Sequence, residues 1–212
     1  LTFRSGMAML TGFVVVVLMG SRFIRWMRAK QGRGQPIRED GIQRHVLEKA
    51  GTPTMGGFMI LAGLFAGTLL WADLRNIQVW VVLLVTGSYG VLGFLDDYAK
   101  VTKQTSAGLS SLQKLVVQFA VAIVAVVLLI LFAPASPTTP GLETSVVFPL
   151  FKQLIFNLGW FYVAFAAITI AGFSNAVNLT DGLDGLAIVP VMIAAAAFGL
   201  ITYLVGNFVF AN

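Results

Sequence analysis

The stretch "NAVNLTDGLDGLA", residues 175–187, lies between two almost wholly apolar segments. Two amides and two acids recur in it at three-residue spacing: Asn175, Asn178, Asp181 and Asp184. Side-chain oxygens in a chain without cysteine suit a hard cation such as Mg²⁺, which prefers one or two carboxylates together with substrate phosphates. Side chains at i and i+3 are neighbours on a helix. We therefore predict that Asp181 and Asp184 bind Mg²⁺ and that Asn178 lies beside them.

A second acidic group, Asp96 and Asp97, follows another apolar segment in "GFLDDYAKV", residues 93–101. We expect this pair at the C-terminal end of a helix, where carboxylates are unfavourable by ~0.3–1 kcal/mol each. A solvated surface pair is one interpretation. The presence of two acidic groups at equivalent depth favours the other, in which a cation relieves the repulsion. For Asp181 and Asp184 the structural alternative is a helix cap and an acid in the first helical turn.

Groups that suit phosphate are expected on the same side. "KAGTPTMGG", residues 49–57, places Thr52 as a helix N-cap and Pro53 at the first helical position. The free N–H groups and positive partial charge of a helix N-terminus favour phosphate. Lys49 stands beside this helix start and Lys114 beside another. Simple capping is the alternative for the threonines, and close helix packing is the alternative for the glycines.

The elements that must position these residues are apolar helices. The chain has 212 residues, of which 58% are hydrophobic and 11% charged, whereas about a quarter are charged in a soluble domain. Six apolar segments are each long enough to cross ~30 Å of hydrocarbon as a helix. They lie near residues 6–24, 55–73, 77–95, 113–133, 153–173 and 185–205. We predict an all-α polytopic membrane protein whose residues 1–212 form one integral membrane domain.

The distribution of Lys and Arg predicts the orientation of these helices. Of the 14 such residues, only Arg4, Arg75 and Lys152 lie outside the segments that follow the first and third helices. Basic residues gather on the cytoplasmic side, so we expect both acidic groups at the cytoplasmic face. The net charge of +5 is explained by this topology. No basic, aromatic-rich groove accompanies it, so no nucleic-acid partner is expected.

The ends and one loop carry further expectations. The chain begins with Leu1, and an apolar segment leads directly into Asn212. We therefore expect a piece of a longer chain that is incomplete at its C-terminal end. The stretch "TSVVFPLF", residues 144–151, follows a Pro- and Thr-rich loop and is predicted as a short surface hairpin.

Four motifs in this order support a resemblance to a known family. They are "GTPTMGG" (51–57), "GFLDDYAKV" (93–101), "GLSSLQK" (108–114) and "NAVNLTDGLDGLA" (175–187). Together they resemble the phospho-N-acetylmuramoyl-pentapeptide transferase family over essentially the whole chain. "NLTDGLDG" with "DD" is typical of the wider superfamily of polyprenyl-phosphate N-acetylhexosamine-1-phosphate transferases. "TPTMGG" favours the muramoyl-pentapeptide branch.

The resemblance implies a fold and an activity. The fold is a ten-helix bundle, usually a homodimer, in the bacterial plasma (inner) membrane, and six of its helices would lie in this chain. The activity is a Mg²⁺-dependent transfer of phospho-MurNAc-pentapeptide from UDP-MurNAc-pentapeptide to undecaprenyl phosphate. This step of peptidoglycan biosynthesis gives lipid I and UMP at the cytoplasmic face. Further acidic and histidine motifs of the family follow the part that matches this chain.

The resemblance also assigns residues by motif position. It gives Asp96, Asp97 and Asp184 catalytic roles, with Asp96 near the lipid phosphate as base or nucleophile, and makes Asp181 and Asp184 metal ligands. Residues for the nucleotide sugar and its phosphates would be Lys49, Thr54, Lys114, Asn178 and Asp181.

Two alternative functions remain open from the sequence. A related GlcNAc-1-phosphate transferase would act on the same lipid carrier. An ion-coupled membrane transporter, from a different class, would bind an ion near the bilayer midplane at broken helices. Acids placed at one membrane interface, with none in mid-helix, argue against an intramembrane relay.

Overall fold

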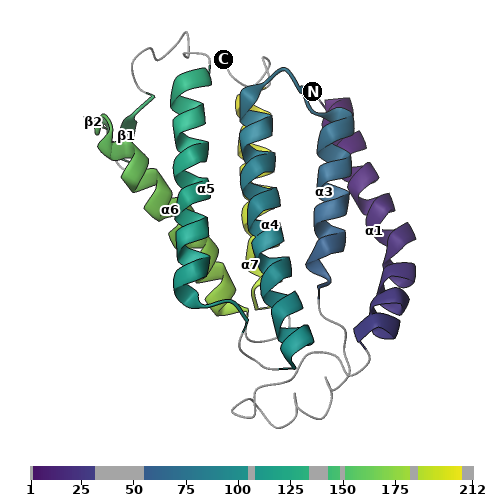
Figure 1. Cartoon of the computed structure of the whole chain (residues 1–212). Helices are drawn as coiled ribbons and strands as arrows, with labels where there is room; N and C mark the ends of the chain where they lie inside the picture. The colour runs from purple at the N-terminus through teal and green to yellow at the C-terminus, as the bar shows by residue number, and fades with distance from the viewer. Residues whose placement is uncertain are drawn as a thin grey trace.

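The computed structural model describes residues 2–31, 55–104, 108–133, 143–148, 151–181 and 186–206. Within these ranges the chain forms helices side by side and one small antiparallel hairpin at one end of the bundle (Figure 1). The helices are α1 (Thr2–Gln31), α3 (Gly57–Trp71), α4 (Ile77–Lys103), α5 (Ser111–Phe132), α6 (Phe161–Thr180) and α7 (Ile188–Val205). The strands are β1 (Ser145–Phe148) and β2 (Phe151–Asn157).

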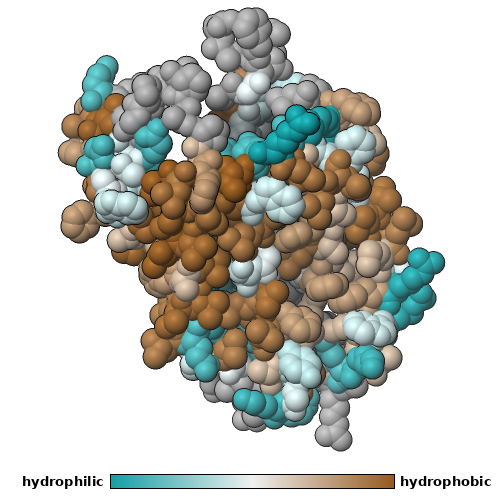
Figure 2. All heavy atoms as spheres, turned by 45° about the horizontal axis from the view of Figure 1, so that its top comes forward, coloured by the Kyte–Doolittle hydropathy of each residue, from teal (hydrophilic) through white to brown (hydrophobic). Residues whose placement is uncertain are grey.

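Helix lengths agree with a multi-pass membrane protein. By length and composition α1, α4, α5 and α6 are able to cross a membrane, whereas α3 and α7 are shorter apolar helices. Figure 2 shows broad apolar surface across the middle of the molecule, with hydrophilic residues gathered toward its two ends. The predominantly helical fold is confirmed, and a membrane crossing by all six helices stays a prediction.

The predicted fifth helix, near residues 153–173, is wrong over its first part. Residues of β2 pair antiparallel with β1, from Ser145 opposite Asn157 to Phe148 opposite Phe151. Hydrophobicity alone does not separate a strand from a helix, and here the pairing with β1 decides. The hairpin expected at "TSVVFPLF" is present but longer than predicted, since β1 lies within this stretch and β2 continues from Phe151 to Asn157. The helix α6 begins only at Phe161, after Gly159 takes the left-handed conformation with φ of 51°.

Helices α1 and α3 pack closely through small residues. A Cβ atom added at Gly63 would lie 2.9 Å from the carbonyl oxygen of Gly12, and one added at Gly67 would lie 2.7 Å from that of Ala8. Small residues spaced four apart let helix backbones approach each other in membranes. Trp71 closes this pair at one end, where its indole N–H donates to Thr11 Oγ1 at 2.9 Å.

A buried polar network joins α4, α5 and α6. The Tyr89 hydroxyl donates to the carbonyl oxygen of Gln118 at 2.9 Å, and the Asn175 amide donates to Gln118 Oε1 at 2.7 Å. Gln118 is buried, and the same two helices also bury alanines, namely Ala122 and Ala125 of α5 and Ala167 and Ala171 of α6. Asn175, the first of the four polar residues in "NAVNLTDGLDGLA", therefore holds helices together in this structure.

The third helix is longer than the sequence predicts. We expected it to end near residue 95, but α4 continues to Lys103, and Gln104 caps it in the left-handed conformation with φ of 51°. Asp96 and Asp97 consequently lie inside the helix, about two turns before its end, and the expectation that they stand at the helix C-terminus is wrong. The polar "DDYAK" sequence is tolerated within the helix because it lies at one end of the bundle, where lysines compensate its acids.

Candidate active site

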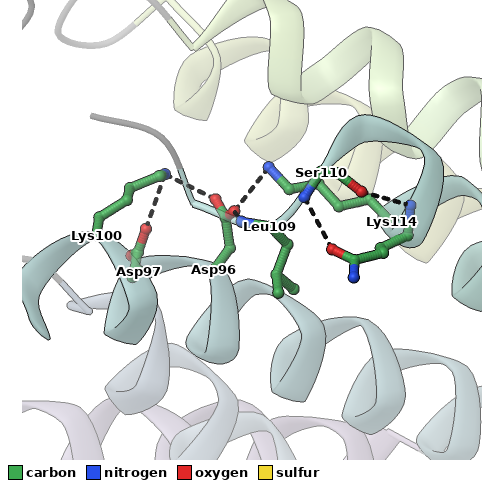
Figure 3. Close-up of polar contacts among 7 residues, drawn as sticks. Asp96, Asp97, Lys100, Leu109, Ser110 and Lys114 are labelled. Carbon is green, nitrogen blue, oxygen red and sulfur yellow. Dashed lines mark hydrogen bonds and ion pairs between the residues drawn. The ribbon is translucent and has the colours of Figure 1, made fainter. Parts of the chain in front are cut away.

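Among the predicted site residues that the structure describes, Asp96 has the most contacts shown in Figure 3. It is 8% exposed. Its Oδ1 accepts from the Leu109 backbone N–H at 2.7 Å and from Lys114 Nζ at 2.8 Å, and its Oδ2 pairs with Lys100 Nζ at 2.7 Å (Figure 3). Hydrogen bonds to an ionised group are roughly twice as strong as neutral ones. The carboxylate is thus held charged by two cations and one main-chain donor.

The start of α5 places two of these donors. Ser110 forms a capping box with Gln113: the Gln113 N–H donates to Ser110 Oγ at 3.2 Å, and Gln113 Oε1 accepts from the Ser110 N–H at 3.1 Å. Such a box fixes where a helix begins. Lys114 follows within the first turn and extends back to α4, as Figure 3 shows. The motif "GLSSLQK" therefore acts as one unit that holds Asp96.

Lys100 links the two acids of the pair. It lies four residues after Asp96 and three after Asp97, and its Nζ is 3.3 Å from Asp97 Oδ1. Both spacings bring side chains together on a helix. Sequence reasoning missed Lys100, although the spacing was a sufficient signal. Sequence reasoning also missed the hydrogen bond from the Leu109 N–H to Asp96, because no local sequence pattern predicts a contact between residues 13 positions apart.

One cavity brings four predicted residues together from two helices. This acidic cavity, of about 670 Å³, is lined by Asp96 and Asp97 from α4 together with Asn178 and Asp181 from the end of α6. Lys100 also lines it, as do residues at the start of α3, including Met55 and Gly57. The prediction that the two acidic groups share one site is consistent with this placement.

The acidic cavity adjoins an apolar one. This α3–α4 groove, of about 340 Å³, shares Phe58, Leu61, Gly90 and Phe94 with the acidic cavity and continues along α3 and α4 to Phe65 and Gly87. Space at Gly87 and Gly90 is taken by side chains of α3, because an added Cβ at either would meet Phe65 or Leu61. A charged head group and a hydrocarbon chain would therefore find suitable surroundings side by side.

Other predicted residues fall differently. Lys114 contacts Asp96 but does not line the acidic cavity. Asp181 was expected near the start of the next helix, but it caps the C-terminal end of α6, and α7 begins only at Ile188. Lys49, Thr54 and Asp184, as well as the expected caps Thr52 and Pro53, lie outside the described residues.

The residues of the acidic cavity fit a magnesium ion that also binds substrate phosphates. Among the described residues, no group of three His, Cys, Asp or Glu side chains is close enough to hold a metal by itself. Mg²⁺ does not require one, since it keeps waters and takes one or two carboxylates with phosphate oxygens. Asp97, Asp181 and the Asn178 amide provide such oxygens around one cavity, whereas both oxygens of Asp96 are already bound to donors.

Comparison with known proteins matches two parts of the chain to known patterns. The profile described as glycosyl transferase family 4 matches residues 79–212. Residues 49–61 match a pattern described as phospho-N-acetylmuramoyl-pentapeptide-transferase signature 1. The first match contains both acidic groups and Lys114, and the second contains Lys49 and Thr54.

Whole sequences give the same relationship. The chain is 81% identical over 212 residues to the phospho-N-acetylmuramoyl-pentapeptide-transferase of Caulobacter vibrioides (strain NA1000 / CB15N), and it is 78% identical to that of Caulobacter sp. (strain K31). It is 64% identical over 211 residues to the protein of the same name from Phenylobacterium zucineum (strain HLK1). In each case the match covers 100% of this chain and 57% of the relative.

Proposed function

The chain belongs to glycosyl transferase family 4, and on that premise we propose that its full-length protein is a phosphoglycosyl transferase of peptidoglycan biosynthesis. The proposed reaction moves phospho-MurNAc-pentapeptide from UDP-MurNAc-pentapeptide to undecaprenyl phosphate, giving lipid I and UMP. Identities of 64–81% to proteins named phospho-N-acetylmuramoyl-pentapeptide-transferase support it. The chain spans just over half of those relatives' length.

The observation that carries the proposal is the junction of the acidic cavity with the α3–α4 groove. Acids, an amide and Lys100 line the first, and only apolar side chains and glycines line the second. Two phosphorylated substrates need cations and metal-binding oxygens, while a polyprenyl chain needs an apolar surface. A site with both properties at one end of a membrane-crossing bundle suits a lipid phosphate acceptor.

In the proposed reaction an oxygen of the lipid phosphate attacks the sugar-bearing phosphorus of the nucleotide sugar. The new P–O bond forms as the P–O bond to UMP breaks, and UMP leaves with the electron pair. Charge stabilisation is the main demand of such a transfer. Lys100 and Lys114 supply positive charge, and a phosphate that takes these lysines from Asp96 releases the carboxylate to act as the base that accepts the proton of the attacking lipid phosphate.

Asp97, Asn178 and Asp181 are proposed to hold Mg²⁺ and the diphosphate, together with Asp184. When bound, the ion would neutralise charge on the diphosphate oxygens. Lys49, Thr54 and Lys114 are proposed to contact the nucleotide sugar and its phosphates. A position in the bacterial inner membrane is proposed from the similarity to the named transferases. The cytoplasmic face is proposed for the acidic cavity from the distribution of Lys and Arg along the sequence. A homodimer is proposed from the resemblance alone.

The test compares donors in the purified full-length protein with undecaprenyl phosphate as acceptor. UMP release with UDP-MurNAc-pentapeptide and none with UDP-GlcNAc is the expected result. The reverse preference would assign the protein to the GlcNAc-1-phosphate transferases. Release that does not depend on the lipid acceptor, or on a divalent cation, would contradict the proposed reaction.

A further inference from the structure

Gly108, shortly before α5, lies directly against Asp96. A Cβ atom added at Gly108 would collide with Asp96 Oδ1, would lie 2.7 Å from its Cγ and would lie 2.9 Å from its carbonyl oxygen. Carbon atoms in favourable contact are ~3.5–4.0 Å apart. The left-handed conformation is not the reason for glycine here, since Gly159 is the glycine with positive φ among the described residues. Space alone requires glycine at this position.

The space left by Gly108 admits a main-chain hydrogen bond. The next residue, Leu109, donates its N–H to Asp96 Oδ1 at 2.7 Å. The capping box of Ser110 and Gln113 immediately afterwards fixes this segment. A lysine side chain can follow a displaced carboxylate, but a main-chain N–H next to a capped helix start cannot. A methyl group at position 108 would therefore break the Leu109 contact first.

This contact determines which carboxylate oxygen faces which neighbour. Oδ1 is held on the α5 side by Leu109 and Lys114, and Oδ2 is directed to Lys100, which lines the acidic cavity (Figure 3). We propose that Gly108 is a positioning residue for the transfer reaction: its missing side chain lets the Leu109 N–H fix Oδ1 of Asp96 and so turns Oδ2 toward Lys100 and the cavity. This inference rests on the proposed function for its kinetic consequence, though not for its geometry.

A purely structural glycine would behave differently. Gly63 is also too close to a neighbour for a side chain, but its neighbours are Gly12 and Val16 of α1. An alanine there would disturb helix packing without touching Asp96. Gly172 in α6 offers the opposite control, because nothing lies within 4 Å of an added Cβ.

The kinetic test uses the full-length protein with Gly108→Ala, Gly63→Ala and Gly172→Ala. Displacing a reacting group by ~1 Å can cost ~100-fold in rate. For Gly108→Ala we expect kcat to fall at least about tenfold while KM for the nucleotide sugar stays within about twofold. For Gly63→Ala we expect a lower melting temperature with an unchanged kcat per folded molecule, and for Gly172→Ala we expect neither change. A kcat for Gly108→Ala within about twofold of wild type would overturn the proposal.

A thermal test needs no assumption about the reaction. Gly108→Ala is introduced into wild type and into Asp96→Ala, where the carboxylate that it would strike is gone. If the two residues act on each other, the loss in melting temperature caused by Gly108→Ala shrinks by at least about half in the second background. Equal losses in both backgrounds would overturn the proposed contact between Gly108 and the Asp96 carboxylate. This outcome does not depend on whether the protein catalyses the proposed transfer.

Poor accumulation of Gly108→Ala would also be informative. In that case the Asp96→Ala/Gly108→Ala double variant is compared with it for yield in the membrane. Recovery of the double variant to the yield of Asp96→Ala supports a steric conflict with the carboxylate. A double variant that accumulates as poorly as Gly108→Ala contradicts it.

Discussion

Replacing Asp96 by Asn should destabilise the protein much more than replacing Asp97 by Asn. Asp96 is 8% exposed and receives one N–H and two lysines at 2.7–2.8 Å. Removing one partner of a fully buried ion pair costs ~3–5 kcal/mol, and an exposed pair contributes only ~0.2–1 kcal/mol. The side chains of Lys100 and Lys114 are 18% and 30% exposed and recover part of their hydration. We therefore expect a loss of ~2 kcal/mol for Asp96→Asn.

For Asp97→Asn the expected loss is smaller. The Lys100 contact of Asp97 is longer, at 3.3 Å, and the Asp97 side chain is 29% exposed, so the loss should stay below ~1 kcal/mol. On the scale of ~2–4 °C per kcal/mol for 150–250 residues, these losses correspond to at most about 4–8 °C and 2–4 °C. The shifts become smaller as a protein becomes longer, and the relatives are longer than this chain.

The assay is thermal unfolding of the full-length protein in detergent micelles, followed by circular dichroism, without substrate and at one pH. High salt should reduce the Asp97 effect more than the Asp96 effect, because exposed charges are screened more strongly. An Asp96→Asn protein as stable as wild type or more so would refute the reasoning. Such a result would mean that repulsion between the two acids outweighs the attraction of the lysines.

Three further expectations follow from the packing and the topology. Gly63→Ala should lower the free energy of unfolding by ~1–3 kcal/mol, because the added methyl group overpacks the contact between α1 and α3. The same thermal assay measures this loss, and unchanged stability would mean that α1 and α3 lie further apart than the structure shows. Gln118→Leu removes one of the two acceptors of the part-buried Asn175 amide, which still donates to the Ala171 carbonyl. It should cost ~1 kcal/mol without changing the magnesium dependence of UMP release; a changed magnesium dependence would place Gln118 in the site. In cells, a membrane-impermeant thiol reagent should label a cysteine introduced at Glu143 but not one introduced at Gln104. Gln104 follows the end of α4 and Glu143 follows the end of α5, so the two positions lie at opposite ends of the helix bundle. The opposite labelling would mean that the orientation in the membrane is reversed.

Much of the fold could be predicted because hydrophobicity and charge are strong signals in a membrane protein. Six apolar segments each contain a helix in the structure, and "TSVVFPLF" contains β1 and the first residue of β2 of the hairpin. The run near 153–173 shows the limit of this reasoning. Its first residues are as apolar as a helix segment, and the choice of strand depends on pairing with β1, which no single segment reveals.

The candidate site was predictable in its residue types and less so in its contacts. The motifs singled out Asp96, Asp97, Asn178 and Asp181, and the structure places all four around one cavity. Helix dipole reasoning then gave Asp96 the wrong environment, because α4 extends to Lys103 and brings Lys100 back to both acids. Helical spacing was sufficient to predict the contacts of Lys100 with Asp96 and Asp97.

Sequence spacing does not predict the contacts that Asp96 makes with the start of α5 and the residues just before it. The Leu109 N–H and Lys114 contact Asp96, and Gly108 leaves room beside it, because the start of α5 lies against α4. Motif order indicates that "GFLDDYAKV" and "GLSSLQK" belong together, but not which atoms meet. Asn175 shows that spacing can also mislead. It shares the three-residue spacing of the site residues, but its side chain donates to Gln118 between helices.

The central claim is that acids from α4 and from the end of α6 form one site for transfer. The most direct measurement is UMP release by full-length Asp181→Asn, titrated with magnesium, against Asp73→Asn as control. Asp73 lies in the turn between α3 and α4, at the opposite end of α4 from the acidic cavity, and accepts from the Arg75 N–H at 3.1 Å. The account predicts that Asp181→Asn lowers turnover by ~10²-fold or more and raises the magnesium requirement, with little change in melting temperature, while Asp73→Asn behaves as wild type. Normal turnover and an unchanged magnesium titration for Asp181→Asn would contradict it.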